Sequence, residues 1–296
     1  MEFGLVSPEQ LGDIDFSLPP DHPHTLHFLT GKATDELPNV FVGCAKRGRP
    51  EWIGKIYPKG TKEKDFLEHY ARQFNTIELN ATFYRLPTRK QTSAWKSKVS
   101  KDFRFCPKFT NKISHIKRLK DVKEMTDFFL DSITGFGETL GPVFLMVHPT
   151  MGPASLERLE VFLESLPKNI EVFTEVRHKD WFAEEENFNR LTSVLNSSKT
   201  GLVITDVAGR RDCLHMFLNS HTAFIRFVGN GLHPTDYQRC DDWVERLKQW
   251  SSKGLKNVYF FMHQHDELNS PILSKYFIEQ VNKRIGTSLQ VPEFVD

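Results

Sequence analysis

The sequence contains few cysteines and no long hydrophobic run. Its four cysteines, Cys44, Cys106, Cys213 and Cys240, include no CxxC pair, which argues against a zinc-ribbon site. No apolar stretch approaches the roughly 18 residues that span a bilayer. The opening segment MEFGLVSPEQLGDIDF carries acids where a secretory signal needs a basic region followed by an apolar one. We therefore expect a cytoplasmic protein with reduced thiols and no membrane association.

Several common catalytic motifs are also missing. There is no HExxH, no GxxxxGK[ST], no GxGxxG and no GxSxG, so zincins, P-loop kinases, Rossmann dehydrogenases and hydrolases with a nucleophile elbow are all disfavoured. The segments that most resemble a phosphate-binding loop are Gly135 to Gly141 and Gly229 to Gly231. The net charge of +1 lacks the global basic excess of a dedicated nucleic-acid binder, which leaves only a local basic patch open.

What the chain does contain is a repeated alternation of apolar runs and helical patterns. Eight short runs are rich in Val, Ile, Phe and Leu, as in parallel strands that are buried on both faces. The runs are Asn39 to Cys44, Asn75 to Leu79, Phe103 to Lys108, Val143 to His148, Glu171 to Val176, Gly201 to Asp206, Ala223 to Phe227 and Asn257 to Met262.

Most of the intervening segments place apolar residues three and four apart, which predicts helices. These helices are Lys62 to Gln73, Val122 to Phe136, Ser155 to Leu166, Glu186 to Leu195, Tyr237 to Ser251 and Pro271 to Ile285. Eight such repeats in 296 residues favour a single α/β domain, a (β/α)8 TIM-type barrel, over an open doubly wound sheet. We expect an irregular arm at residues 1–38 with one helical turn near Pro8 to Leu11, the barrel at 39–286 and a tail at 287–296.

Ionisable and polar residues recur where the predicted strands end. In the stretch FNTIELNATFYRLP, an apolar strand carries Glu78, and an acid there is costly unless it is paired or used. The carboxyl ends of barrel strands form the active-site face. The residues expected there are Cys44, Glu78, Asn80, Lys108, His148, Glu175, Arg177, His178, Asp206, Arg226, His263 and His265.

Each of these residues also has a structural interpretation. Glu78 and Lys108 lie on neighbouring strands and are able to form an ion pair. Glu175 and Arg177 share one strand face, so they either pair with each other or present Arg177 to an anionic substrate group. Asp206 is placed either to act in catalysis or to cap the short helix expected after it.

The remaining strand-end residues leave a choice between anion binding and metal binding. Arg226 lies among Phe and Ile, where an arginine needs a carboxylate or phosphate partner. His148, Glu175, Asp206 and His263 make a mixed nitrogen and oxygen set that suits Zn or Mn. Histidines of this kind are nevertheless more often structural, and no cofactor is required by any motif.

A basic stretch, KFTNKISHIKRLKDVK, runs from Lys108 to Lys123. Beside Trp52, Phe83, Tyr84 and Trp181 it would form an aromatic and cationic rim that accepts a polyanion such as a nucleic acid. The alternative is a solvated helix and loop surface.

Taken together, the motifs along the chain resemble those of the DUF72 family, the YecE-like proteins, over nearly all of residues 40–285. The matching segments are Trp52-x-Gly54-x-x-Tyr57-Pro58, Phe74 to Asn80, Thr82 to Pro87, Trp95, Phe103 to Phe105 with Lys108, Ser114-His115, Gly141-Pro142, Glu175-x-Arg177-His178-x-x-Trp181, Asp206, and Arg226 with Gly229.

The resemblance implies a TIM barrel, in agreement with the strand count, but no established reaction. It also implies that the family's polar positions are Glu78, Asn80, Tyr84, Lys108, His115, Glu175, Arg177, Asp206 and Arg226. The chain departs from the usual pattern in three places: Cys44-Ala45-Lys46 replaces Ser-Gly-Trp, Met146 and His148 replace Gln and Pro, and Met262-His263 replaces Asn-Asn. These departures weaken the metal interpretation, because His148 and His263 would be ligands in a subset only.

The leading functional expectation is an enzyme, a hydrolase, lyase or isomerase, that acts on a small anionic or phosphorylated substrate. Glu78, Glu175, Lys108 and Asp206 are the expected catalytic residues. The expected substrate contacts are Asn80, Tyr84, His115, His148, Trp181, Arg177, Arg226 and His263. The alternatives are a metal-dependent phosphodiesterase or nuclease, and a barrel that binds nucleic acid or a partner without catalysis.

Overall fold

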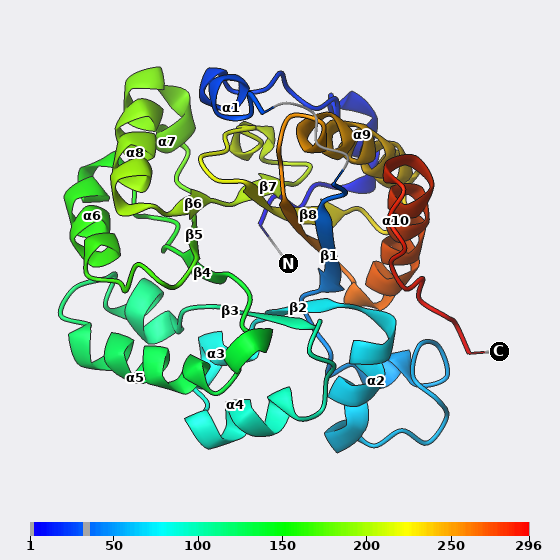
Figure 1. The fold of residues 1–296 in the computed structure, drawn as a ribbon. Helices are drawn as coiled ribbons and strands as arrows, with labels where there is room; N and C mark the ends of the chain where they lie inside the picture. The colour runs from blue at the N-terminus through cyan, green and yellow to red at the C-terminus, as the bar shows by residue number, and fades with distance from the viewer. Residues whose placement is uncertain (1–2, 32–35, 296) are drawn as a thin grey trace. The chain divides into compact units, whose positions relative to one another are not determined.

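The computed structural model describes residues 3–31 and 36–295, and the parts of the predicted arm and tail at residues 1–2, 32–35 and 296 lie outside this range. Strands and helices alternate along the chain (Figure 1). The strands of the described residues are β1 (Asn39–Cys44), β2 (Thr76–Leu79), β3 (Arg104–Pro107), β4 (Val143–Met146), β5 (Val172–Glu175), β6 (Gly201–Leu202), β7 (Ile204–Asp206), β8 (Thr222–Gly229) and β9 (Asn257–Gln264).

Each of the eight predicted strands is present, because β6 and β7 together occupy the sixth predicted run. They are separated at Val203, whose N–H donates to the carbonyl of Thr174 at 2.9 Å. The α-helices are α1 (Pro23–Phe28), α2 (Phe66–Gln73), α3 (Ala81–Tyr84), α4 (Arg89–Lys96), α5 (Lys123–Thr134), α6 (Leu156–Glu164), α7 (Asp180–Ala183), α8 (Glu185–Ser198), α9 (Pro234–Ser251) and α10 (Ser270–Ile285).

The chain forms two compact units. We call Met1–Ile77 with Ile204–Asp296 the terminal unit, and Glu78–Val203 the central unit. The division of the sequence into arm, barrel and tail stays a prediction.

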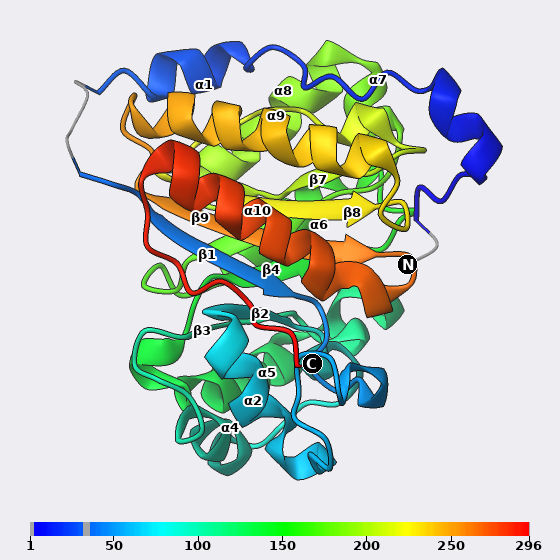
Figure 2. The ribbon, with the colours of Figure 1, turned by 90° about the vertical axis from the view of Figure 1, so that its right-hand side faces the viewer.

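The terminal unit contains a four-stranded parallel sheet in the order β1-β9-β8-β7. Asn39 pairs with Asn257 at one end of the β1–β9 ladder and Cys44 pairs with Met262 at the other. Helices α9 and α10 run side by side across this sheet (Figure 2), and the stacked rings of Phe260 and Phe277, 3.9 Å apart, join β9 to α10. Apolar burial between helix and sheet provides most of the driving force for such packing.

Gly43 in β1 is required by a close backbone approach. A Cβ atom there would collide with the carbonyl oxygen of Thr76 and approach the hydroxyl of Tyr70 to 2.9 Å. That hydroxyl accepts from the N–H of Cys44 at 2.7 Å and donates to the carbonyl of Thr76 at 2.9 Å. The Tyr70 side chain therefore fixes the end of β1 to the start of β2.

The central unit contains the parallel sheet β4-β5-β6, and β3 pairs with β2 in a two-stranded sheet. Met146 of β4 is opposite Glu175 of β5, and a bridge between Lys108 and Phe144 joins the end of β3 to β4. The carboxyl ends of β3, β4 and β5 consequently lie along one edge of the unit.

The arm is not a loose extension, because it packs along the terminal unit. It contains the expected helical turn, a 3₁₀ helix at Pro8–Asp13, and also α1, which its irregular sequence did not predict. The side chain of Thr25 in α1 donates to the carbonyl of Met216 at 2.9 Å. Among the described residues, no helix has both the length and the apolar character that crossing a membrane requires.

Candidate functional site

Glu78 lies at the end of β2 with its side chain fully buried. The amide of Asn80 donates to Oε1 of Glu78 at 2.8 Å. A charge-assisted hydrogen bond of this kind lowers the cost of burying a carboxylate. Asn80, which follows β2, therefore stabilises the buried carboxylate of Glu78.

Lys108 follows β3, and both its backbone and its ammonium group make close contacts. Its backbone N–H donates to the hydroxyl of Thr82 at 3.0 Å, and that hydroxyl donates to the carbonyl of Lys108 at 2.7 Å. Its ammonium lies 4.3 Å from the ring centroid of Phe83, 5.3 Å from that of Phe144 and 3.5 Å from Sδ of Met146. Cation–π contacts favour the charged amine, so Lys108 presents a buried positive charge.

Glu175 and Arg177 form a buried ion pair at the end of β5. Nε of Arg177 donates to Oε1 of Glu175 at 2.6 Å, and the two side chains are 9% and 1% exposed. This contact is the local ion pair, one of the two interpretations that the sequence left open. Because Glu175 is opposite Met146 and Met146 contacts the ammonium of Lys108, the pair and the lysine lie in one neighbourhood.

His115 lies in a π-helix at Lys112–Ile116, a rare element that often marks functional sites. Its ring centroid is 5.0 Å from that of Phe83 and 5.3 Å from that of His148. Burial and the nearby charges of Lys108, His148 and Arg177 lower the pKa of His115 to about 4, against the opposing charge of Glu175. The imidazole is therefore neutral near pH 7.

His148 stands at the edge of this group. Nδ1 of its ring is 2.8 Å from the hydroxyl of Thr150. Partial burial and the charge of Arg118 lower the pKa of His148. The central unit thus brings together two carboxylates, two buried cations and two imidazoles that the sequence placed on separate segments.

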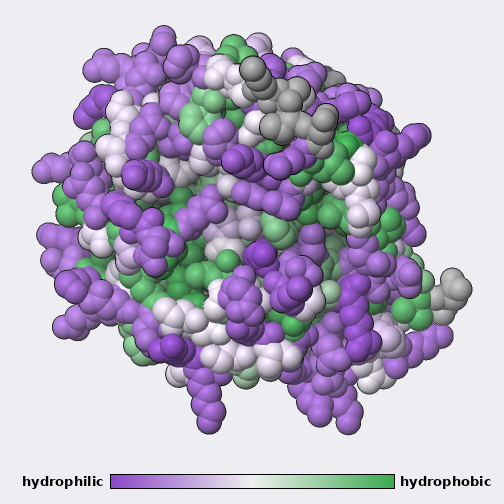
Figure 3. All heavy atoms as spheres, in the orientation of Figure 1, coloured by the Kyte–Doolittle hydropathy of each residue, from purple (hydrophilic) through white to green (hydrophobic). Residues whose placement is uncertain are grey.

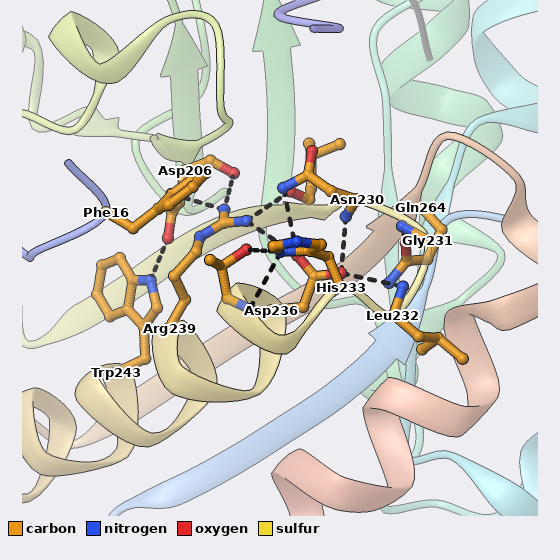
Figure 4. A network of polar contacts seen from close by, with 12 residues as sticks. Phe16, Asp206, Asn230, Gly231, Leu232, His233, Asp236, Arg239, Trp243 and Gln264 are labelled. Carbon is orange, nitrogen blue, oxygen red and sulfur yellow. Dashed lines mark hydrogen bonds and ion pairs between the residues drawn. The ribbon is translucent and has the colours of Figure 1, made fainter. Parts of the chain in front are cut away.

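Asp206 belongs to a different arrangement, in the terminal unit (Figure 4). Its fully buried carboxylate accepts from Nη2 of Arg239 at 2.7 Å, from Nε1 of Trp243 at 2.7 Å and from Arg211. Burial raises the pKa of Asp206, but the two guanidinium groups and these hydrogen bonds outweigh it and leave the pKa lowered. Instead of capping a helix backbone, Asp206 joins β7 to α9 through side chains.

The Gly229 to Gly231 segment does not offer a set of backbone amides to a phosphate. The N–H groups of Asn230 and Leu232 donate to Oδ2 of Asp236 at 2.7 and 3.1 Å. The N–H of Gly231 donates to Oε1 of Gln264 at 2.8 Å. The loop is closed by side chains of its own unit, so its resemblance to a phosphate loop is misleading.

Arg226 and His263 are also buried and lie together in the terminal unit. Nη2 of Arg226 is 3.3 Å from Nε2 of His263, and Nδ1 of His263 is 3.4 Å from Oε1 of Glu267. A guanidinium only donates, so Nε2 accepts and Nδ1 carries the proton that faces Glu267. Ser270 donates to the other oxygen of Glu267 at 2.6 Å.

The predicted aromatic rim is only partly present. Trp52 and Trp181 are 0% and 1% exposed, and Nε1 of Trp181 donates to the carbonyl of Met151 at 2.8 Å. Trp181 is therefore a core residue whose polar atom is satisfied, and the expectation that it contacts substrate lacks support. Tyr84, in contrast, is 75% exposed.

Metal binding gains no support from the side-chain arrangement. Within residues 3–31 and 36–295, no group of three or more His, Cys, Asp or Glu side chains is placed to hold a metal ion. The set proposed from the sequence, His148, Glu175, Asp206 and His263, is thus not assembled as a ligand shell for Zn or Mn.

Some of the neighbours that define these sites were missed by sequence reasoning. Phe144 was assigned only to a strand and Met146 was noted only as a departure from the family pattern, yet both contact the ammonium of Lys108. Arg239 and Glu267 lie on or beside helices, where a charge normally indicates a solvated face. The spacing of Asp236 and Arg239, three residues apart on α9, was the available signal for the second polar cluster.

Comparison with known proteins relates this chain to proteins of unassigned function. A family model described as "Protein of unknown function DUF72" matches residues 41–293. The UPF0759 protein YecE of Escherichia coli K12 is 29% identical over 271 residues, which cover 86% of this chain and 96% of that protein.

Solved structures agree with the fold. A DUF72 family protein from Thermotoga maritima MSB8 aligns with a TM-score of 0.63 and 23% identity, and covers 82% of this chain and 99% of its own. One from Enterococcus faecalis V583 aligns with a TM-score of 0.62 and 16% identity, and covers 87% of this chain and 98% of its own. The predicted α/β class and (β/α)8-like fold are confirmed.

Proposed function

The chain belongs to the DUF72 family, and from this premise we propose that it is an enzyme that performs acid–base chemistry on a small substrate bound through a phosphate or carboxylate group. The family brings no reaction, so the proposal depends on the side chains of the central unit. The proposal has two parts: the protein is an enzyme for an anionic substrate, and each of these side chains has a stated role.

The observation that carries the proposal is the concentration of buried charge in the central unit. Glu78, Lys108, Glu175 and Arg177 are all 9% exposed or less, and they lie in or just after the carboxyl ends of β2, β3 and β5. Removing a charge from water costs several kcal/mol unless close partners compensate. Such a concentration at carboxyl strand ends is typical of a catalytic site in this fold.

The two cations are suited to hold the anionic group. Lys108 is fixed by its backbone and by Phe83, and Arg177 is oriented by Glu175. Preorganised cations of this kind stabilise a negative charge that grows in the transition state. The carboxylates are the groups that would exchange protons, with Glu78 held by Asn80.

His115 has a separate part in the proposal. A neutral imidazole hydrogen-bonds to a substrate oxygen without adding a further positive charge beside Lys108 and Arg177. Its lowered pKa keeps it in that form across the physiological range. Asp206, already held by two arginines and an indole, is assigned to structure, and the proposal for the central unit gives no role to Arg226 and His263, which lie in the terminal unit.

Anion binding is tested with inorganic phosphate as the probe. We expect phosphate to raise the thermal midpoint of the wild-type protein above that in sodium chloride of equal ionic strength, and Lys108→Met to abolish this increase. Lys101→Met is the matched control, because Lys101 is exposed and makes no ion pair with any described residue. An equal phosphate response in all three proteins would refute the assignment of Lys108.

Catalysis is tested with phosphorylated and carboxylated metabolites that pass the binding test. Nuclear magnetic resonance would detect turnover of any of them. We expect Glu78→Gln to lower the rate by about 10²- to 10⁴-fold, as for loss of a general acid–base group, and to retain binding. Undiminished turnover in Glu78→Gln would remove this carboxylate from the mechanism.

A further inference from the structure

Positive charge is concentrated in one part of the sequence. Between Arg85 and Lys123 there are 13 lysines and arginines but only two acids, although the whole chain has 39 and 38. The rest of the chain is therefore acidic overall. All of this basic segment lies in the central unit.

Several of these cations are exposed and are not neutralised locally. Arg85, Lys112, Lys117, Arg118 and Lys120 are exposed, and no ion pair joins their side chains to another described residue. By comparison, the exposed Lys123 is paired with Asp127 at 2.6 Å. The unpaired cations give the central unit a positive surface able to attract a polyanion.

An aromatic groove of about 450 Å³ opens within the same surface. Tyr84 and Phe128 contribute exposed rings, 75% and 52% accessible to solvent. Phe83 supports Tyr84 from behind in an edge-to-face contact with centroids 5.1 Å apart. The groove is lined by Tyr84, Arg85, Leu86, Thr110, Lys112, Glu124, Met125 and Phe128.

Exposed aromatic rings beside cations have a recognised use. Figure 3 shows apolar patches between hydrophilic side chains on the face that it draws, and large exposed apolar groups commonly mark binding surfaces. Proteins that hold single strands place the bases on aromatic rings and the phosphates beside lysine and arginine. The groove combines both features, with Glu124 as the one acid among its lining residues.

We propose that this groove binds single-stranded nucleic acid. A base stacks on Tyr84, with Phe128 as a second exposed ring that lines the groove, while Arg85 and Lys112 contact the adjoining phosphates. Lys117, Arg118 and Lys120 extend the positive surface for the rest of the strand. A duplex fits less well, because its bases are already stacked on each other. The proposal is independent of the catalytic proposal, since it uses none of the buried charged residues.

The test measures fluorescence anisotropy of labelled oligothymidylate and oligouridylate at several sodium chloride concentrations. We expect the logarithm of the association constant to fall linearly with the logarithm of salt, by about 0.7 for each phosphate neutralised. We expect Tyr84→Ala to weaken binding about 5- to 150-fold, the range for loss of one base stack. Tyr84→Phe, which keeps the ring, should retain binding.

The cations are tested by charge reversal. The double variant Arg85→Glu with Lys112→Glu should weaken binding and reduce the salt slope by about 1.4 or more. Lys59→Glu with Lys62→Glu makes the same change in net charge at exposed positions of the terminal unit and should leave both quantities unchanged. Thermal melts confirm that each variant is folded.

Four results with the nucleic-acid probes would overturn the proposal. They are no binding at low salt, equal affinity for a duplex of the same length, an equal loss in the control pair, and unchanged binding in Tyr84→Ala. Vesicles of phosphatidylserine and phosphatidylcholine provide the final comparison. If they displace the oligonucleotide and bind more tightly through the same residues, the surface recognises anionic lipid instead.

Discussion

His115 and Asp206 both have lowered pKa values, but the physical consequences are opposite. Burial and neighbouring cations make His115 lose its charge, whereas two guanidinium groups overcome burial and make Asp206 keep its charge. A neutral imidazole remains able to hydrogen-bond to a substrate. A carboxylate that holds two arginines and an indole is committed to the packing of β7 against α9.

The pKa of His115 predicts a pH dependence of stability. The ordinary value is 6.5 and the folded value is about 4, so the unfolded chain binds more protons between these limits. The contribution of His115 to the free energy of unfolding is therefore fully present above pH 6.5 and is lost as the pH falls toward 4. We expect His115→Gln to make the free energy of unfolding less dependent on pH in this window.

Urea unfolding at pH 7 and pH 5 measures this effect. His69→Gln is the control, because it makes the same replacement at a half-buried histidine of the terminal unit, and it should keep the wild-type dependence. An identical loss of stability on acidification in the wild type and in His115→Gln would contradict the prediction. His148, whose pKa is also lowered, accounts for part of any dependence that remains.

Sequence reasoning located many ionisable residues but could not identify their partners. Glu78, Lys108 and Glu175 were found because each follows an apolar strand. Only the Glu175–Arg177 contact could be predicted from spacing, because those two residues share one strand face. The partners of Asp206 come from α9 and from the segment after β7, and such long-range pairing has no local signature.

The segment between β3 and α5 has a backbone conformation that its amino-acid composition does not predict. After the π-helix, Arg118, Leu119 and Asp121 have positive φ angles of 49°, 65° and 52°, although none is glycine. Left-handed conformations cost such residues about 1–2 kcal/mol each. The sequence predicted a basic stretch here, but tertiary packing, not propensity, determines how the stretch presents His115 and its lysines.

Strands and long helices were predicted better than short helices for a physical reason. A hydrophobic period needs several turns to be recognised, so α1, α3 and α7 carry little pattern. Helix α4 did offer a signal, because Thr88 and Gln91 form a capping box in which N–H of Gln91 donates to the hydroxyl of Thr88 at 3.3 Å. Capping residues were thus more informative than apolar spacing for this element.

The end of α8 allows a prediction at the same scale. Lys199 adopts the left-handed conformation, with φ of 56°, and its exposed side chain follows the last helical residue. Glycine is favoured at this position because it has no Cβ. We expect Lys199→Gly to raise the free energy of unfolding by about 0.5–1 kcal/mol, measured by urea unfolding.

Lys199→Ala separates conformation from side chain. It removes the same amine but retains the Cβ, so it should bring no gain in stability. Equal stabilisation by Ala and Gly would show that the lysine side chain, and not the backbone angle, is responsible.

At the scale of the whole molecule, the fold class was predictable and the composition of the two compact units was not. Alternating strands and helices without a linker indicated one α/β fold. The terminal unit, however, combines residues from both ends of the chain, and no composition change marks where the chain enters or leaves it. The arm is part of this unit, which its irregular sequence also did not reveal.

The arm's attachment yields a prediction for the terminal unit. Oδ1 of Asp21 accepts from Nη1 of Arg246 at 2.6 Å and from Nε1 of Trp250 at 3.0 Å. Hydrogen bonds to a charged group each contribute about 1.5–3 kcal/mol. Because the pair is partly exposed, we expect Asp21→Asn to lower the free energy of unfolding by about 1–2 kcal/mol.

Chemical unfolding and limited proteolysis check this together. Asp13→Asn, an exposed position in the same arm, should leave both unchanged. If Asp21→Asn neither destabilises the protein nor makes the arm more susceptible to protease, the contacts with α9 do not anchor it.

The ladder between β1 and β9 also sets an order of events during translation. Asn39 of β1 pairs with Asn257, which is synthesised 218 residues later. At about 5–20 residues per second the ribosome needs roughly 10–40 s to reach it. Residues 78–203 are complete well before then. The nascent chain therefore carries β1 with unpaired backbone groups after residues 78–203 have been synthesised, so this strand is open to pairing with other chains until β9 is made.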